Sequence, residues 1–244
     1  MFEAILVRVA VIRFPGSNCD LDTVYVLRSV VGLETELVWH KHFNDGDFDA
    51  VVLPGGFSYG DALRAGVIAA YSPAMKRVKE MAKEGKPVLG ICNGFQILVE
   101  SELLSGALLR NDCLTFICKW VTLRVDNDKT AFTNMMKKGQ ILKMPIAHNE
   151  GRYYNDIEAI REMEENNQIV FRYSNDKGEL TSESNPNGSL ENIAGICNLE
   201  GNVVGLMPHP ERASETILSP FKTDHGKLVF ESMVNAIRNG GKYR

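Results

Sequence analysis

The chain has 244 residues, of which 44% are hydrophobic, and it carries a net charge of −4. This is enough chain for one large α/β domain or two small ones, and the acidic balance argues against a nucleic-acid-binding protein. Five cysteines without a CxxC pair form no recognisable zinc motif and favour a reducing compartment, the cytoplasm. The N-terminus lacks the features of a signal peptide, and no apolar run is long enough to cross a membrane.

The first half of the chain alternates strand and helix patterns. A helix is expected over residues 19–31, and a long helical pattern over 61–84 is broken near Ser72-Pro73. Buried strands are expected over residues 7–14, 35–40, 50–53 and 88–91. Strands that alternate with helices predict a mostly parallel sheet, whose site lies at the carboxyl ends of the strands.

The second half is richer in strand patterns. They cover residues 114–125, 144–147, 169–173, 193–197 and 202–207, with a hairpin turn at Glu200-Gly201. Residues 178–192 are polar and predict an exposed loop, and a closing helix is expected over 223–239. We therefore predict an α/β fold with a mostly parallel central sheet flanked by helices and a β-rich second half. No linker divides the chain, so residues 1–244 are expected to form a single domain.

Cys92 is the first candidate catalytic residue. It follows the apolar strand 88–91, has Gly90 and Gly94 two positions to either side, and precedes a helical pattern. This strand–turn–helix arrangement places a nucleophile at the apex of a tight turn, beside the free N–H groups of a helix N-terminus. A buried core cysteine is the alternative, but the flanking glycines favour the nucleophile.

A cysteine nucleophile needs a base and a group that orients the base. His40, His42 and His225 have polar surroundings and are expected at the surface. Two histidines remain, each in an H-x-E pattern after an apolar run: His148-Asn-Glu150 and His209-Pro-Glu211. Periodicity does not choose between them. Neither pattern is the helical two-histidine motif of zinc proteases, and no metal site is expected.

Several motifs together resemble a known family. The segments Pro54-Gly-Gly-Phe-Ser-Tyr-Gly-Asp61, Gly90-Ile-Cys-Asn-Gly-Phe-Gln96 and Pro208-His-Pro-Glu211 are similar, in this order, to motifs of the class I (triad) glutamine amidotransferases. Three further segments narrow the resemblance to the separate glutaminase subunits of phosphoribosylformylglycinamidine synthases. They are residues 14–20, residues 147–153, and residues 185–189 with 193–196.

The resemblance implies the roles of individual residues. Cys92 is the nucleophile, His209 its base and Glu211 the group that orients the base. The backbone N–H groups of Gly56 and Asn93 would form the oxyanion hole. The residues expected to bind glutamine are Gln96, Phe57, Ser58, Asn149 and Gly151. Gln96 lies one helical turn beyond Cys92 and therefore shares its face of the helix.

The function implied by the resemblance is hydrolysis of glutamine to glutamate and ammonia through a cysteine thioester. The ammonia would pass to a large ATP-dependent synthetase subunit of purine biosynthesis, possibly with a small accessory subunit. ATP and Mg²⁺ are expected on that partner, since this chain has no G-x-x-x-x-G-K-[ST] loop, and no cofactor is expected here. A glutaminase for a different synthetase is one alternative. A binding or redox-sensing module is another, but it leaves Glu211 and the glycine loop without a role.

Overall fold

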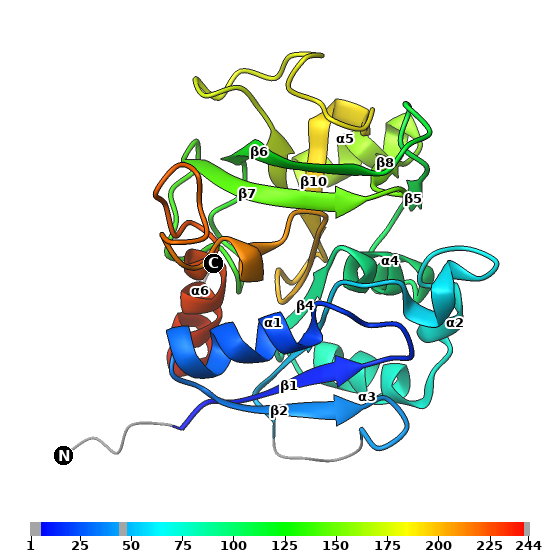
Figure 1. Ribbon diagram of the computed structural model, residues 1–244, viewed down its shortest axis with the longest axis vertical. Helices are drawn as coiled ribbons and strands as arrows, with labels where there is room; N and C mark the ends of the chain where they lie inside the picture. The colour runs from blue at the N-terminus through cyan, green and yellow to red at the C-terminus, as the bar shows by residue number, and fades with distance from the viewer. Residues whose placement is uncertain (1–5, 44–47, 242–244) are drawn as a thin grey trace.

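A nine-stranded sheet runs through the protein, which is described by a computed structural model over residues 6–43 and 48–241 (Figure 1). The strand order is β2-β1-β3-β4-β11-β10-β9-β6-β7. The pairs from β2 to β11 are parallel, and the pairs from β11 to β7 are antiparallel. The sheet is thus mixed, and the predicted α/β class with a β-rich second half is confirmed.

The parallel part consists of β1 (Arg8–Arg13), β2 (Glu34–Trp39), β3 (Ala50–Leu53), β4 (Val88–Ile91) and β11 (Val203–Leu206). All but β2 are near-continuous apolar runs, which are typical of strands covered by helices on both sides. β2 is the edge strand, and exposed polar residues alternate with buried ones in its first half. The strands predicted from the sequence here agree with these bounds to within a residue or two.

The antiparallel part consists of β6 (Ile117–Val125), β7 (Ile141–His148), β9 (Ile169–Tyr173) and β10 (Ile193–Cys197). In β7 buried and half-buried residues alternate along the whole strand, because successive side chains point to opposite faces. Pro145 lies in this strand, which is the edge of the sheet, where proline is tolerated. The hairpin predicted at Glu200-Gly201 joins β10 to β11.

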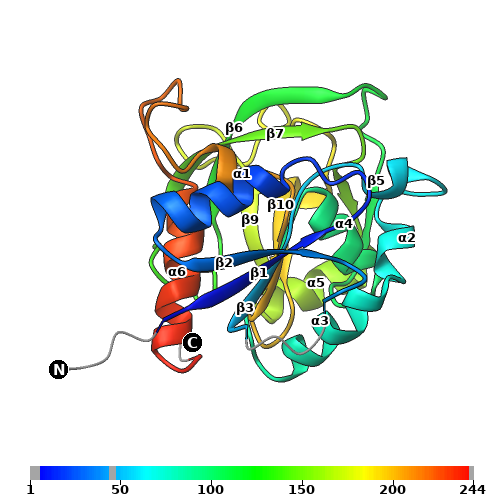
Figure 2. The same cartoon turned by 60° about the horizontal axis from the view of Figure 1, so that its bottom comes forward.

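Helices cover both faces of the parallel part (Figure 2). On one face lie α1 (Asp20–Tyr25), which continues as the π-helix η1 (Val26–Val30), and α6 (Lys227–Arg238). On the other lie α2 (Val67–Ala70), α3 (Pro73–Lys83) and α4 (Asn93–Glu100). The remaining elements are α5 (Ile157–Glu165), a two-stranded sheet of β5 (Ala107–Leu109) and β8 (Arg152–Tyr154), and the 3-10 turns η2 (Ser58–Asp61), η3 (Leu190–Asn192) and η4 (Pro210–Arg212).

Two predicted helices begin later than expected. The helical pattern over 61–84 fails at its start because Asp61, Leu63 and Gly66 all have positive φ, which a right-handed helix cannot contain. The closing helix begins at Lys227 rather than residue 223. The hydrophobic patterns of the sequence did not reveal α5, β5 or β8.

Two histidines expected at the surface are not there. His40 is only 1% exposed, because its ring packs against those of Phe14, Trp39 and Tyr59. His225 lies in the turn before α6, is half-buried, and accepts the backbone N–H of Lys143 at 2.9 Å. His42 is exposed, as predicted.

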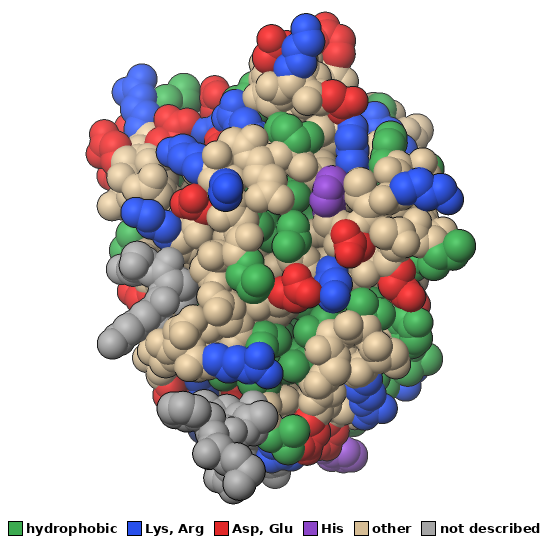
Figure 3. All heavy atoms as spheres, turned by 90° about the vertical axis from the view of Figure 1, so that its left-hand side faces the viewer, with side chains coloured by type: hydrophobic (Ala, Val, Ile, Leu, Met, Phe, Trp, Pro, Cys, Tyr) green, Lys and Arg blue, Asp and Glu red, His purple; other side chains and the backbone are tan. Residues whose placement is uncertain are grey.

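Two observations concern membranes and nucleic acids. Among the described residues, no helix is long and apolar enough to cross a membrane. On the face shown in Figure 3, basic and acidic side chains are interspersed, without a continuous basic area. This distribution is consistent with the net charge of −4.

Candidate active site

Cys92 occupies the sharp turn between β4 and α4. Its backbone has φ 50° and ψ −104°, a strained conformation for a residue other than glycine. Gly94 permits the close packing behind the turn, since a Cβ there would lie 1.9 Å from the carbonyl oxygen of Leu53. The predicted strand–turn–helix elbow is therefore present. Its cysteine is 4% exposed, and the Cys92 thiol donates a 3.7 Å hydrogen bond to the carbonyl of Ala147.

His209 and Glu211 form a buried pair after β11. The Nδ1–H of His209 donates to Oε1 of Glu211 at 2.6 Å, and each residue is 2% exposed. Pro210 starts the 3-10 turn η4, which folds Glu211 back onto the preceding imidazole. The bond to Nδ1 leaves Nε2 available, and Nε2 is buried without another hydrogen-bond partner among the described residues.

The electrostatics link this pair to Cys92. Burial alone would lower the pKa of His209, but the charge of Glu211, followed by that of an ionised Cys92, raises this pKa well above its ordinary value. The contribution of Cys92 to this shift, through charge and a side-chain hydrogen bond, shows that the two side chains are close enough to interact. The structure thus brings together the three residues predicted to form the triad.

Hydrogen bonds from residues 14–19 hold the glycine loop after β3, which contains Gly55 and Gly56. The carbonyl oxygen of Gly55 accepts two hydrogen bonds, from the N–H groups of Asn18 at 3.3 Å and Cys19 at 3.2 Å. Because the peptide is planar and trans, the N–H of Gly56 points the opposite way. Gly56 has φ 148° and no space for a Cβ, which would lie 2.8 Å from the backbone nitrogen of Asn18. These contacts give the 14–20 segment a structural role.

A chain of amide hydrogen bonds joins the residues predicted to bind glutamine. The N–H of Ser58 donates to Oδ1 of Asn93 at 3.1 Å, and Nδ2 of Asn93 donates to Oε1 of Gln96 at 2.9 Å. Nε2 of Gln96 then donates to the carbonyl of Glu150 at 2.6 Å. The chain connects the glycine loop, the helix after Cys92 and the segment after β7. Phe57 lies outside it, 40% exposed, with its ring 6.3 Å from that of Phe116.

The second candidate histidine has different partners. Nδ1 of His148 is 3.0 Å from Oδ1 of Asn111, which also accepts the N–H of Gly151 at 3.2 Å. Burial, together with the charge of His209, lowers the pKa of His148 to about 3, so its ring stays neutral. The carbonyl of Asn149 accepts the N–H of Asn111 at 2.9 Å. His148, Asn149 and Gly151 therefore form a fixed wall organised by Asn111.

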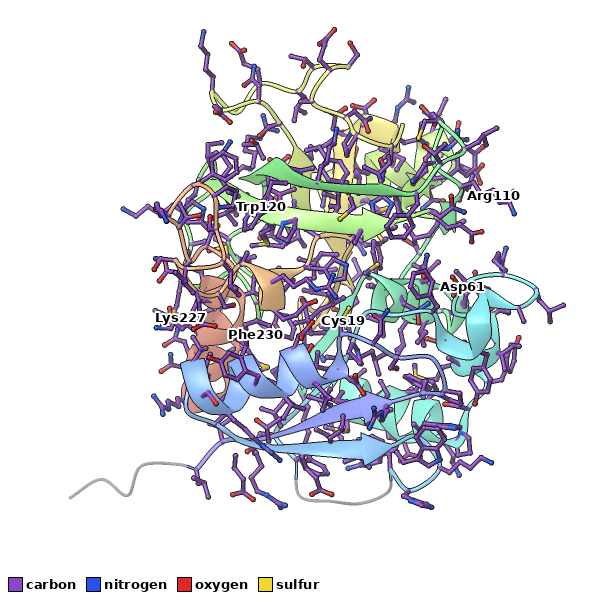
Figure 4. The ribbon with its side chains drawn as sticks, viewed as in Figure 1. Cys19, Asp61, Arg110, Trp120, Lys227 and Phe230 are labelled. Carbon is purple, nitrogen blue, oxygen red and sulfur yellow. The ribbon has the colours of Figure 1, made fainter. Side chains whose placement is uncertain are left out.

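A pair of carboxylates lies next to this wall. Asp61 follows the glycine loop, and burial, with the charge of Glu150, raises its pKa to about 6. Its Oδ1 is buried without a hydrogen-bond partner among the described residues, and Glu150 is paired only loosely, at 3.6 Å, with the exposed Arg110. Figure 4 shows Asp61 and Arg110 on the same side of the molecule. The negative charges of two neighbouring carboxylates favour the binding of a positively charged ligand.

Three residues near the site were not singled out from the sequence: Cys19, Asp61 and Asn111. Asp61 and Cys19 lie within segments that carry the family resemblance, but their spacing to Cys92 or His209 follows no local rule. Asn111 belongs to no motif. Only the tertiary structure brings it to His148 and Gly151, 37 and 40 residues away in the sequence.

Comparisons with known proteins show the family of this chain. A family model described as a CobB/CobQ-like glutamine amidotransferase domain matches residues 6–243. The chain belongs to this glutamine amidotransferase family. Two similar proteins are named phosphoribosylformylglycinamidine synthase subunit PurQ: one from Methanosarcina acetivorans and one from Aquifex aeolicus, each 56% identical. The matches cover 94% and 93% of this chain and 98% of each relative.

Two solved structures share the fold of this amidotransferase. A chain in the structure of PurLQS from Thermotoga maritima is 43% identical, with a TM-score of 0.81 over 96% of this chain and 100% of that one. A different protein of that organism, a glutamine amidotransferase, is 19% identical, with a TM-score of 0.54 over 97% and 94% of the two chains. The second likeness concerns the fold alone.

Proposed function

We propose that this glutamine amidotransferase is the glutaminase subunit of a phosphoribosylformylglycinamidine synthase. It hydrolyses glutamine to glutamate and ammonia, and the ammonia serves de novo purine biosynthesis. The observation that carries the proposal is the strained Cys92 elbow beside the buried His209–Glu211 pair. The 56% identity to relatives named as this subunit supports the choice of synthetase.

In the proposed reaction, the Cys92 thiolate attacks the side-chain amide carbon of glutamine. The N–H groups of Gly56 and Asn93 stabilise the oxyanion, which is typically worth about 3–4 kcal/mol per donor. The imidazolium of His209, held by Glu211, gives its proton to the departing ammonia. His209 then takes a proton from water, which attacks the thioester and releases glutamate and the free thiol.

The buried amide chain supports a glutamine subsite. Gln96 is fixed at both ends of its side-chain amide, so it can hold the wall of the pocket in one position. Asn149 and Gly151 belong to the facing segment, and Ser58 and Phe57 to the glycine loop. We assign the α-ammonium of glutamine to Asp61 and Glu150, because a bound cation would offset both the burial and the repulsion from Glu150 that raise the pKa of Asp61.

The remaining part of the reaction is assigned to partners. We propose a large synthetase subunit that holds ATP and Mg²⁺ and consumes the ammonia, with a small accessory subunit in the same complex. The similarity to a chain of PurLQS from Thermotoga maritima supports such an assembly. All five cysteines are free thiols, which fits the cytoplasm as the compartment.

The test is Cys92→Ala in the assembled complex. We expect glutamine-dependent synthesis to fall by more than about 10³-fold, the scale seen when a triad nucleophile is removed. Synthesis from added ammonium chloride should remain, because only the thioester step needs the thiol. Cys113→Ala, which removes an exposed thiol, is the matched control and should leave both activities intact. Equal loss of both activities in Cys92→Ala would mean that Cys92 has a structural role.

A further inference from the structure

A second thiol lies against the His209–Glu211 pair. Cys19 precedes α1 and is 2% exposed. A Cβ added at Gly55 would lie 3.1 Å from the Sγ of Cys19 and 2.8 Å from Cε1 of His209, so both side chains pack on the same α-carbon. Figure 4 shows Cys19 near the middle of the molecule, at the start of α1. The proposed glutaminase reaction gives this thiol no task.

Cys19, His209 and Glu211 present the donor atoms of a soft-metal site. One ligand atom from each lies within 4.8 Å of the other two. In a tetrahedral zinc site with ordinary bond lengths, such atoms are about 3.4–3.6 Å apart. A metal at Nδ1 of His209 therefore has to open its 2.6 Å contact with Oε1 of Glu211, while the Sγ of Cys19 is already within reach. A thiolate and a carboxylate together balance the charge of Zn²⁺, and an imidazole completes a donor set that zinc prefers.

A second observation is independent of this clustering. Oε2 of Glu211 is buried and has no hydrogen-bond partner among the described residues. A buried carboxylate oxygen without a partner is costly, and metal coordination is one way to satisfy it. The amide oxygen Oδ1 of Asn18, 3.1 Å from the Sγ of Cys19, is available as a fourth ligand.

We propose that Cys19, His209 and Glu211 form an inhibitory binding site for Zn²⁺. The metal binds Nδ1 of His209 and the Sγ of Cys19. The proton on Nδ1 of the neutral ring moves to Nε2, and the thiol proton of Cys19 leaves to solvent. Nε2 then has no free electron pair with which to accept a proton from Cys92 or from water, so hydrolysis stops although Cys92 itself is not bound.

The positive charge of Arg212 disfavours a bound metal. The proposal therefore predicts that variants of Arg212 and of Cys19 change zinc affinity in opposite directions. Its Nη2 donates to the Sγ of Cys19 at 3.1 Å, and its Nε lies 3.4 Å from a carboxylate oxygen of Asp22. The side chain is 39% exposed, so it can swing away when a cation enters. Removing this positive charge should therefore strengthen zinc binding, whereas removing the thiol should weaken it.

The binding test uses Co²⁺ as a spectroscopic substitute for Zn²⁺. The full-length chain carries Cys113→Ser and Cys118→Ser, which remove the exposed thiols, and Cys92→Ser, which removes the nucleophile. We expect one Co²⁺ per chain with thiolate-to-cobalt absorption in the near ultraviolet, and its loss when Cys19→Ser is added. Cys197 stays in both proteins, so the difference reports Cys19 alone. Absorption that is absent, or that survives Cys19→Ser, overturns the proposal.

The inhibition test rests on the proposed function and uses the assembled complex with buffered free Zn²⁺. Each variant is compared with its own rate of glutamate release without metal. Cys19→Ser should weaken inhibition by at least about 100-fold, beyond the 10–100-fold typical of an outer partner of a metal ligand. Arg212→Gln should tighten it, and this arm holds even if Cys19→Ser folds poorly. Equal inhibition in all three proteins would place the zinc on Cys92 and His209 and refute the site.

The two tests distinguish a failure of the proposed function from a failure of the proposed metal site. If the metal-free complex releases no glutamate, the proposed function is wrong, while the cobalt spectrum still decides whether the site exists. If glutamate is released normally and no cobalt binds, the function stands and the metal site is refuted.

Discussion

Two regions of the molecule carry the same H-x-E pattern, but they differ in the backbone turn and in the partners of the histidine and the glutamate. In residues 209–211 the turn through Pro210 folds the carboxylate back, and Glu211 lies 2.6 Å from the imidazole of His209. In residues 148–150 the histidine ends the edge strand β7, and its ring meets the amide of Asn111 instead. The carboxylate of Glu150 instead lies 3.6 Å from the guanidinium of Arg110, and its charge contributes to the raised pKa of Asp61.

The difference sets the protonation of the two rings. Burial lowers the pKa of His209, but the charges of Glu211 and Cys92 together with hydrogen bonds to Cys19 and Cys92 raise it further, so it ends above its ordinary value. His148 has only a neutral hydrogen-bond partner, and burial lowers its pKa to about 3. A group that exchanges protons near neutral pH must be able to hold one, so only His209 qualifies as the base. Spacing in a sequence is therefore insufficient, since the backbone turn decides which side chain the carboxylate meets.

The largest predicted effect is on turnover, and it tests whether the two histidines have different roles. His209→Ala should lower the turnover of glutamine by about 10²–10⁴-fold, the usual contribution of a general acid–base group. His148→Ala should act mainly on the KM for glutamine, because it loosens the wall held by Asn111. The measurement is glutamate release at saturating and limiting glutamine. A larger loss of turnover in His148→Ala would reverse the assignment.

The two glutamates provide a smaller and sharper test. Glu211→Gln should lower turnover by roughly 10²-fold, less than His209→Ala, because an orienting carboxylate contributes less than the base it holds. It should also lower the pKa of His209, since the charge of Glu211 is what raises it. The readout is the pH profile of turnover. Glu150→Gln, the matched substitution in the other segment, should leave the shape of that profile unchanged.

The sequence was sufficient where the structure depends on local turns and burial. The elbow at Cys92 was predictable because a buried strand, two small residues and a helix follow one another within about a dozen positions. The inner parallel strands were predictable because their apolar runs are short and continuous, as in Ala50–Leu53 and Val88–Ile91. The helix expected over 61–84 was wrong at its start, since left-handed backbone at Asp61 and Leu63 leaves no trace in hydrophobic spacing.

The sequence was insufficient where contacts join distant segments. Cys19 meets Arg212 across 193 positions, and Asn111 meets His148 across 37. Neither contact has a spacing that a pattern could reveal. His40 was placed at the surface for the same reason, because the rings of Phe14 and Tyr59 that bury it come from other segments. The choice between His148 and His209 came from resemblance, and the structure supplies its physical basis.

The smallest predicted effect concerns the carboxylates beside the second H-x-E segment. Asp61→Asn should raise the KM for glutamine by about 10-fold to 100-fold, the loss expected for one charge-assisted hydrogen bond to the α-ammonium, and leave turnover nearly unchanged. In the wild-type protein the KM should also rise as the pH falls through about 6, where Asp61 takes up a proton and loses its charge. The measurement is the KM between pH 5 and 8.

Stability gives this prediction a readout that does not involve glutamine. The pKa of Asp61 rises from its ordinary value of 3.8 to about 6 in the folded state, so between these values the folded protein binds a proton more tightly than the unfolded chain. Raising the pH through this window therefore lowers the free energy of unfolding, and Asp61→Asn should remove part of that loss. Urea unfolding at pH 4.5 and 7 measures the difference. If the variant changes KM but not the pH dependence of unfolding, Asp61 binds the ammonium although its pKa is not raised in the folded state.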